Sequence, residues 1–89
     1  MNEIIRKATA GTMESSDAYV EIEPGKGVEI QLESVVEAQF GESILSTVKD
    51  VLKECGVENA RVHIADRGAL DCVIRARVET AVMRGRGED

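Results

Sequence analysis

The sequence predicts an α+β fold, a two-layer sandwich in which a small, mostly antiparallel sheet has two helices packed on one face. Apolar and polar residues alternate over 17–33 and 60–65, which is typical of strands that lie on a core. Over 35–55 and 69–84, apolar residues recur every three or four positions, as they do in amphipathic helices. Two helical stripes and one sheet face leave water most simply when both helices cover the same side of the sheet.

The 89 residues of the chain suit a single small domain, 1–89. Hydrophobic residues make up 43% of the chain, which is enough for a folded core. Residues 1–10 and 85–89 lack a core-facing pattern, and the second of these segments consists mainly of glycines and acidic residues. We therefore expect both ends to be frayed tails.

Three strands are expected before the first helix. Residues 8–14 form a short strand, and a turn at Ser15-Ser16-Asp17 follows it. Residues 17–33 then form a hairpin that reverses at Pro24-Gly25-Lys26-Gly27. The side chains expected to face the core from this hairpin are Val20, Ile22, Val28, Ile30 and Leu32.

The helix over 35–55 has signals at both ends. Ser34 and Glu37 have the spacing of a capping box at its start, and Gly56 suits the left-handed residue that closes a helix. We expect Phe40 and Ile44 to be buried against the hairpin. The apolar stripe consists of Val36, Phe40, Ile44, Val48, Val51, Leu52 and Cys55.

A strand over 60–65 and a turn at Asp66-Arg67-Gly68 precede the second helix. On the outer face of that helix, Asp71, Arg75 and Glu79 follow one another at four-residue spacing, where each ion pair stabilises a helix by about 0.2–0.5 kcal/mol. The side chains expected to face the core are Ala60, Val62 and Ile64 from the strand and Leu70, Val73, Ile74, Val78, Ala81 and Val82 from the helix.

Composition argues against several classes of function. The net charge is −6 and aromatic residues make up 2% of the chain, so it lacks the basic and aromatic surface that nucleic acids require. It also lacks a basic amphipathic face for an anionic membrane and an apolar run of the roughly 18 residues of a membrane span. The apolar stretch near the N-terminus is too short for a signal peptide. We expect a cytoplasmic protein with neither nucleic-acid nor membrane partners.

Patterns typical of catalytic or metal sites are absent from the sequence. It has no phosphate-binding glycine loop, no nucleophile elbow and no HExxH zinc motif. The one histidine, His63, is expected to face away from the core without a role. Cys55 and Cys72 are isolated and are expected to be inert residues among helical apolar neighbours. We expect neither catalytic residues nor a metal site.

Two serines, Ser15 and Ser16, lie between Glu14 and Asp17. From spacing alone this segment is a polar turn, because Ser and Asp side chains bond to the backbone in turns. A serine hydroxyl needs a base before it can react, and no such base is visible nearby. Modification of either serine would therefore require a separate enzyme.

Three segments of the chain form a set. They are Ala10-Gly11-Thr12-Met13-Glu14-Ser15-Ser16-Asp17, Val36-Glu37-Ala38-Gln39-Phe40-Gly41, and Asp66-Arg67-Gly68-Ala69-Leu70-Asp71-Cys72 with Arg75-Ala76-Arg77. Taken in this order, over about residues 8–84, they resemble the acyl-carrier subunits of bacterial citrate lyases.

The resemblance implies a covalently attached prosthetic group, 2'-(5''-phosphoribosyl)-3'-dephospho-CoA, joined to serine through a phosphodiester. The modified serine of the family corresponds to Ser15. Ser16 is the alternative, because the family often has glycine after the modified serine and this chain has a second serine there. The resemblance further implies that Arg77 could meet a phosphate of the group or an acidic partner, whereas Arg75 is expected to pair with Asp71 and Glu79.

The implied function is that of a non-catalytic subunit. The thiol at the end of the group would carry acetyl and citryl thioesters while citrate is cleaved to acetate and oxaloacetate. The implied partners are the transferase (alpha) and lyase (beta) subunits of citrate lyase and the enzyme that attaches the group. A tether of this kind keeps an intermediate at high effective concentration near both active sites.

Two other interpretations remain open. The acyl carrier subunit of malonate decarboxylase is similar to this family and uses the same type of group, although the Ala-Gly-Thr-x-Glu-Ser start favours citrate lyase. A protein-interaction domain without a cofactor also fits the composition, and an intact-mass measurement would separate it from a carrier. A phosphopantetheine carrier is not expected, because such carriers are four-helix bundles with Asp-Ser-Leu at a helix start.

Overall fold

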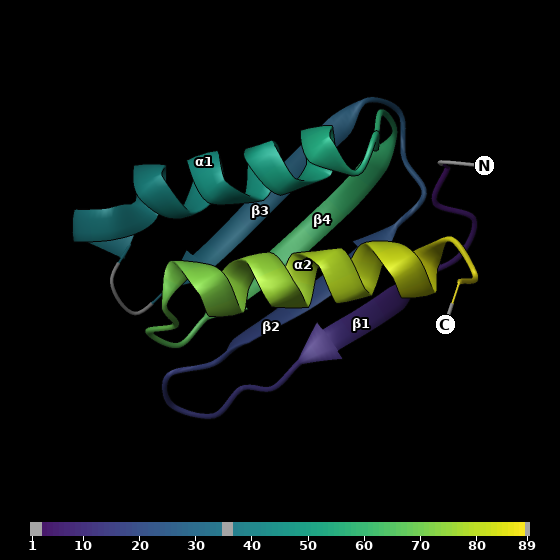
Figure 1. Cartoon of the computed structure of the whole chain (residues 1–89). Helices are drawn as coiled ribbons and strands as arrows, with labels where there is room; N and C mark the ends of the chain where they lie inside the picture. The colour runs from purple at the N-terminus through teal and green to yellow at the C-terminus, as the bar shows by residue number, and fades with distance from the viewer. Residues whose placement is uncertain (1–2, 35–36, 89) are drawn as a thin grey trace.

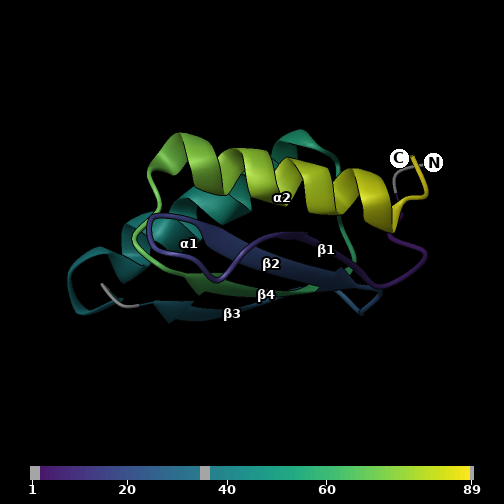
Figure 2. The same cartoon turned by 90° about the horizontal axis from the view of Figure 1, so that it is seen from below.

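A four-stranded sheet carries both helices on one of its faces in the computed structural model of the chain, which describes residues 3–34 and 37–88 (Figures 1 and 2). This arrangement confirms the predicted α+β fold. In chain order the elements are β1 (Ala8–Gly11), β2 (Ala18–Glu23), β3 (Val28–Ser34), α1 (Glu37–Glu54), β4 (Ala60–Asp66) and α2 (Asp71–Gly85).

The strands lie in the order β1-β2-β4-β3. β1 pairs antiparallel with β2, β2 pairs antiparallel with β4, and β3 pairs parallel with β4. The hairpin predicted over 17–33 is therefore wrong, because β4 lies between its two strands. β4 alternates buried apolar residues on the helix side and ends in a buried Ala65 and Asp66. A strand this buried is better placed in the middle of a sheet than at its edge.

The connection between β2 and β3 passes over the start of β4. The Ala60 amide donates to the Gly27 carbonyl oxygen at 2.8 Å, and the Gly27 amide donates to Asn59 Oδ1 at 2.9 Å. A side chain on Gly25 would come within 3.2 Å of the backbone of Ala60 and Arg61. The predicted turn exists, but its glycines let it cross the first residues of another strand.

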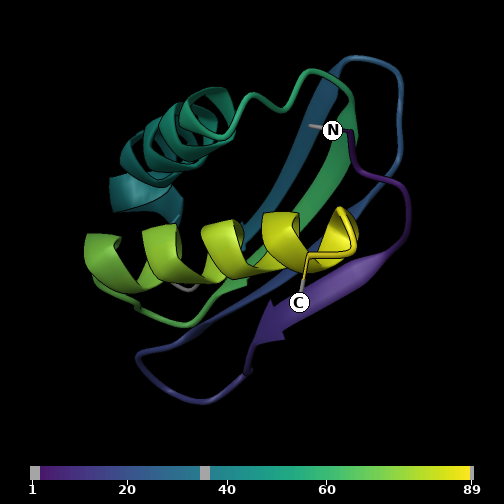
Figure 3. The same ribbon diagram turned by 45° about the vertical axis from the view of Figure 1, so that its right-hand side comes forward.

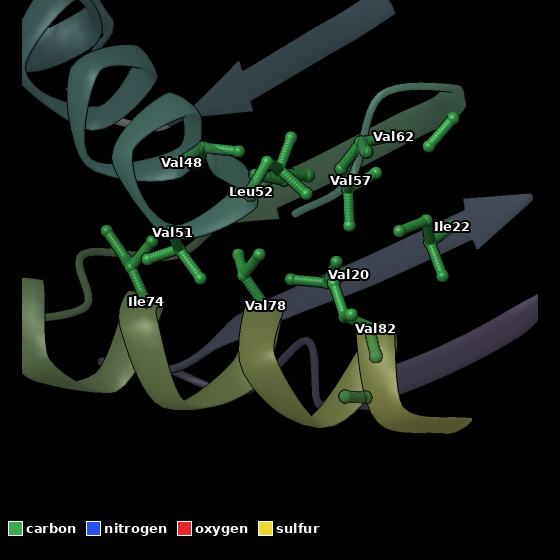
Figure 4. Close-up of a cluster of buried hydrophobic side chains, with 14 of the residues drawn as sticks. Val20, Ile22, Val48, Val51, Leu52, Val57, Val62, Ile74, Val78 and Val82 are labelled. Carbon is green, nitrogen blue, oxygen red and sulfur yellow. The ribbon is translucent and has the colours of Figure 1, made fainter. Parts of the chain in front are cut away.

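The core lies between the sheet and the two helices (Figure 4). Val48, Val51 and Leu52 of α1 point toward the space between α2 and the sheet, where Ile74 and Val78 of α2 also lie. The buried apolar residues are Ile4, Ala10, Ala18, Val20, Ile22, Ile44, Val48, Val51, Leu52, Val57, Ala60, Val62, Ile64, Ala65, Ile74, Val78, Ala81 and Val82. Most of the predicted core positions are among them.

Helix α1 ends as expected, with Gly56 in the left-handed region at a φ of 73°. The capping box expected at its start cannot be assessed, because the Glu37 side chain lies outside the described residues. The Ser34 hydroxyl donates to Asp66 Oδ2 at 2.8 Å, so it joins β3 to the end of β4.

Phe40 is 52% exposed, so the prediction that it is buried is wrong. Ile44 is 4% exposed, which confirms the prediction that it is buried. The first turns of α1 extend beyond the end of the sheet (Figures 1 and 2), where no strand lies beneath them. Leu70, which precedes α2 at the same end, is also exposed, although it was expected to face the core. Val28 at the start of β3 and Cys72 in α2 are exposed as well.

The ends of the described chain contact each other. Ile4 is buried in the core, and the amides of Ile5 and Arg6 both donate to the Gly85 carbonyl oxygen, at 2.9 and 3.2 Å. Arg84 donates from Nη1 to the Thr9 carbonyl oxygen at 2.8 Å. Residues 4–10 and the last turn of α2 are thus held together, where the sequence indicated frayed tails.

Arg75 joins the two helices. Its Nη2 lies 2.7 Å from Glu54 Oε1 at the end of α1, whereas the sequence predicted pairs with Asp71 and Glu79. The prediction considered one helix alone, and the neighbouring helix supplies the carboxylate that Arg75 contacts.

Within residues 3–34 and 37–88, neither helix combines the length and the apolarity that a membrane crossing requires.

Core burial predicts different costs for two substitutions. Ile22→Ala, at a fully buried position, should lower the free energy of unfolding by about 2–5 kcal/mol. Phe40→Ala, at a half-exposed position, should lower it by no more than about 1 kcal/mol. Urea titration of both variants checks this, and equal losses would place the Phe40 ring in the core.

Candidate functional site

The loop between β1 and β2, residues 12–17, lies at the end of the sheet where α1 and α2 begin (Figures 1 and 3). Residues 12–16 are all exposed, and Asp17 is half-buried. Among the described residues, neither the Ser15 nor the Ser16 hydroxyl has a hydrogen-bond partner. The loop therefore presents two free hydroxyls to solvent.

The base of the loop is fixed by the Asp17 carboxylate. Arg77 of α2 forms a bidentate contact with it, donating from Nε at 2.9 Å and from Nη2 at 3.1 Å. The Thr12 hydroxyl donates to Oδ2 at 2.7 Å, and the Ala18 amide donates to Oδ1 at 2.7 Å. These bonds, those from Arg77 above all, lower the pKa of Asp17 to about 2. One carboxylate thus joins both ends of the loop to α2.

Two residues of the loop region have left-handed backbones. Gly11 has a φ of 89°, and a side chain there would meet the Ala18 carbonyl oxygen at 1.8 Å. Ser16 has a φ of 67°, which glycine adopts freely and other residues adopt at a cost. The chain turns sharply at Ser16, so Ser15 stays outside while Asp17 returns to the sheet.

The turn after β4 supports the loop from the side. The Ser16 amide donates to the Arg67 carbonyl oxygen at 2.8 Å, and the Arg67 amide donates to the Asp17 carbonyl oxygen at 2.9 Å. Asp66 is 1% exposed and accepts from the Ala69 amide at 2.9 Å, which holds the turn in shape. Two segments that are distant in the sequence therefore meet at Ser16.

The other candidate residues lie away from this loop. His63 is half-buried in β4 on the sheet face without helices, so the expectation that it faces away from the core is confirmed. Cys55 is half-buried at the end of α1, and burial raises the pKa of its thiol, which fits an inert residue. Within the described ranges, no three His, Cys, Asp or Glu side chains gather as metal ligands would.

Sequence reasoning identified the serines but missed what holds them. The family resemblance suggests Arg77 as a ligand for a phosphate or for an acidic partner, and the structure pairs it with Asp17, 60 positions away. Sequence patterns did not indicate that Arg67 and Asp66 support the loop. Arg67 contacts the loop through its backbone, and Asp66 bonds to the Ala69 amide and to Ser34 of the neighbouring strand. Thr12 and Asp17 lie close together in one predicted turn, and this was the only local pattern in the sequence that indicated a contact of Asp17.

Comparison with known proteins gives consistent results. A family described as "Malonate decarboxylase delta subunit (MdcD)" matches residues 5–85. Proteins named citrate lyase acyl carrier protein are 48% identical in Haemophilus influenzae, over 96% of this chain and 90% of that protein, and 52% identical in Escherichia fergusonii, over 92% and 87%. The one in Serratia proteamaculans is 54% identical over 91% of this chain and 81% of its own length.

A solved structure also matches the fold. It is a chain of a Pseudomonas malonate decarboxylase hetero-tetramer in complex with malonate, with a TM-score of 0.81 over 92% of this chain and 86% of that one. The two sequences are 23% identical, so this likeness concerns the fold alone.

The close approach at Gly11 predicts a large effect of a single methyl group. Gly11→Ala should lower the free energy of unfolding by about 2–4 kcal/mol, because it adds both left-handed strain and a collision with Ala18. Gly27→Ala is the matched control: its φ of 69° is similar, but no atom lies within 4 Å of the added carbon. The control should lose only about 1–2 kcal/mol in the same denaturant titration.

The low pKa of Asp17 predicts a pH dependence of stability. The folded-state pKa is about 2, below the usual 3.8, so the ionised carboxylate stabilises the fold above pH 4 and this stabilisation is lost as the pH falls toward 2. Asp17→Asn should therefore be less stable than wild type at pH 7, and the difference should shrink between pH 4 and pH 2.

Denaturant midpoints measured across this pH range test the prediction. Arg77→Gln should flatten the profile in the same way, because it removes the main partner of the carboxylate. A constant difference between wild type and Asp17→Asn from pH 5 to pH 2 would contradict the assignment.

Proposed function

The chain belongs to the citrate lyase acyl carrier protein family, and from this we propose that Ser15 is the residue to which its acyl-carrying group is attached. The relatives are named as carriers, so the chain is a carrier subunit and does not itself catalyse the reaction. The observation that carries the proposal is the exposed Ser15 hydroxyl, unbonded to any described residue, on a loop whose base is firmly held.

Citrate lyase is favoured over malonate decarboxylase by similarity. The relatives that are about half identical over most of the chain are named for citrate lyase. The family description and the solved neighbour name malonate decarboxylase, but that neighbour is 23% identical, which makes it a related family. A cofactor-free interaction domain fits less well, because carrier proteins of this kind hold a covalent group.

The backbone supports Ser15 over Ser16 as the attachment residue. The family often has glycine after the modified serine, and Ser16 has the positive φ that glycine prefers. The second serine of this chain is therefore at the position whose conformation favours glycine, and Ser15 is at the position before it. The Ser16 amide also bonds to Arg67, which ties this residue to the turn after β4.

The residues present fit a group joined through a phosphodiester, which we propose to be 2'-(5''-phosphoribosyl)-3'-dephospho-CoA. When attached, this group supplies a thiol that holds acyl groups as thioesters. The Ser15 oxygen would form the ester bond without breaking a hydrogen bond to any described residue. Asp17 and Arg77 would hold the loop in place while the group moves, because their contact does not involve Ser15.

The proposal includes partners and location. No described side chain bonds to the Ser15 hydroxyl as a base would, so a separate enzyme attaches the group. The transferase and lyase subunits of citrate lyase would then receive the arm in turn, since a tether raises the effective concentration of the carried acyl group at both sites. We place these events in the cytoplasm.

Ser15→Ala tests the attachment site. Co-expressed with the attaching enzyme, this variant should gain no mass, and the reconstituted lyase should release no oxaloacetate. Its free energy of unfolding should change by only about 0.5 kcal/mol, because an exposed hydroxyl contributes little. Intact-mass spectrometry with peptide mapping, the lyase assay and a urea titration measure the three quantities.

Ser16→Gly is the matched control. It removes the neighbouring hydroxyl while retaining a backbone that adopts positive φ, so it should load and turn over like wild type. If Ser15→Ala gains the group and Ser16→Gly does not, the site is wrong by one residue. If the wild type never gains mass in the presence of the attaching enzyme, the carrier proposal fails.

A further inference from the structure

An apolar hollow lies beside the loop that carries Ser15. It has a volume of about 590 Å³ and lies between the first turns of α1 and the turn after β4. Phe40 and Leu70, which are 52% and 72% exposed, form part of its wall. Ile44 and Ala69 belong to the same wall.

The fold does not require these two side chains to be exposed. Phe40 continues the apolar stripe in the first turn of α1, and Leu70 is the N-cap residue of α2, where its side chain makes no capping hydrogen bond. An isolated exposed apolar residue is common, but large ones gathered around one hollow are typical of a surface that contacts another molecule. The hollow is therefore a candidate binding surface.

The turn after β4 connects the hollow to the loop of residues 12–17. Gly68 lines it, and the preceding residue, Arg67, exchanges two backbone hydrogen bonds with Ser16 and Asp17. Met13, also in that loop, is 49% exposed. A subunit whose active site receives an arm from Ser15 would come close to this end of the molecule.

We infer that this hollow is the docking surface for the catalytic subunits that receive the arm, with an apolar side chain of the partner inserted between Phe40 and Leu70. The inference rests on the proposed function. Well-packed apolar anchors in such pockets commonly dominate the energy of an interface.

Charge indicates the rest of the partner's surface. Asp71 lines the hollow and Glu14 lies in the loop; both are exposed, and neither forms an ion pair with a described residue. The net charge of the chain is −6. The matching surface would therefore have Lys or Arg around its apolar anchor, which would also accelerate association at low salt.

Direct binding tests this surface without depending on the arm. The dissociation constant of the unloaded carrier for the purified transferase and lyase subunits is measured by calorimetry for wild type, Phe40→Ala and Leu70→Ala. At least one of these subunits should bind each variant roughly tenfold or more weakly. Asp71→Asn should reduce the salt dependence of binding.

Ile5→Ala and Met83→Ala are matched controls. Both residues are exposed and apolar, at 63% and 49%, but Met83 lies near the end of α2, the Ile5 amide bonds to Gly85 at that same end, and neither lines the hollow. Their dissociation constants should equal that of wild type. Thermal unfolding of all five variants confirms that each is folded before binding is compared.

The outcomes separate the two proposals. If Ser15 is loaded and active but Phe40→Ala and Leu70→Ala bind both subunits like wild type, the docking surface is wrong and the proposed function stands. If Ser15 is never loaded, the proposed function fails, while the dissociation constants still decide the surface. If the resonances of Phe40 shift on loading without any partner, and its substitution leaves subunit binding unchanged, the hollow holds the arm itself and the inference is overturned.

Discussion

The contact between Asp17 and Arg77 joins the loop of residues 12–17 to the body of the protein. The carboxylate accepts four hydrogen bonds, two from Arg77 and one each from Thr12 and the Ala18 amide. The side chain is only 14% exposed, which by itself disfavours the charge, but the four hydrogen bonds outweigh this desolvation and keep the carboxylate ionised. The loop is thus anchored at both ends, and the residues between the anchors remain free for chemistry.

The order of the strands brings the supporting turn to this loop. β1, β3 and β4 end at the same end of the sheet, and β2 begins there. Because β4 pairs directly with β2, the turn that follows it lies next to Ser16 and Asp17. The position of β4 between β2 and β3 therefore determines the strand order and also brings Arg67 next to Ser16 and Asp17.

Periodicity predicted the helices and strands because it reports burial within a single segment. It could not show that β2 and β3 are separated, since a glycine-rich turn serves equally for a hairpin and for a crossing over a third strand. Nor could it show that α1 extends beyond the sheet, which exposes Phe40 although this residue continues the apolar stripe. The contacts of Arg75 with Glu54 and of Arg77 with Asp17 depend on tertiary packing, and no local pattern contains that information.

These two arginines, two positions apart in α2, show how framework and function are divided in a chain of this size. Arg75 binds the end of α1 and so stabilises the pairing of the helices, whereas Arg77 binds the loop. Ser15 itself makes no hydrogen bond to a described residue, so the folded state does not depend on its hydroxyl. An attachment residue must be of this kind, because esterification would break any bond in which its hydroxyl was the donor. The loop keeps its shape through Gly11, Ser16 and Asp17, and Ser15 is left free to be modified.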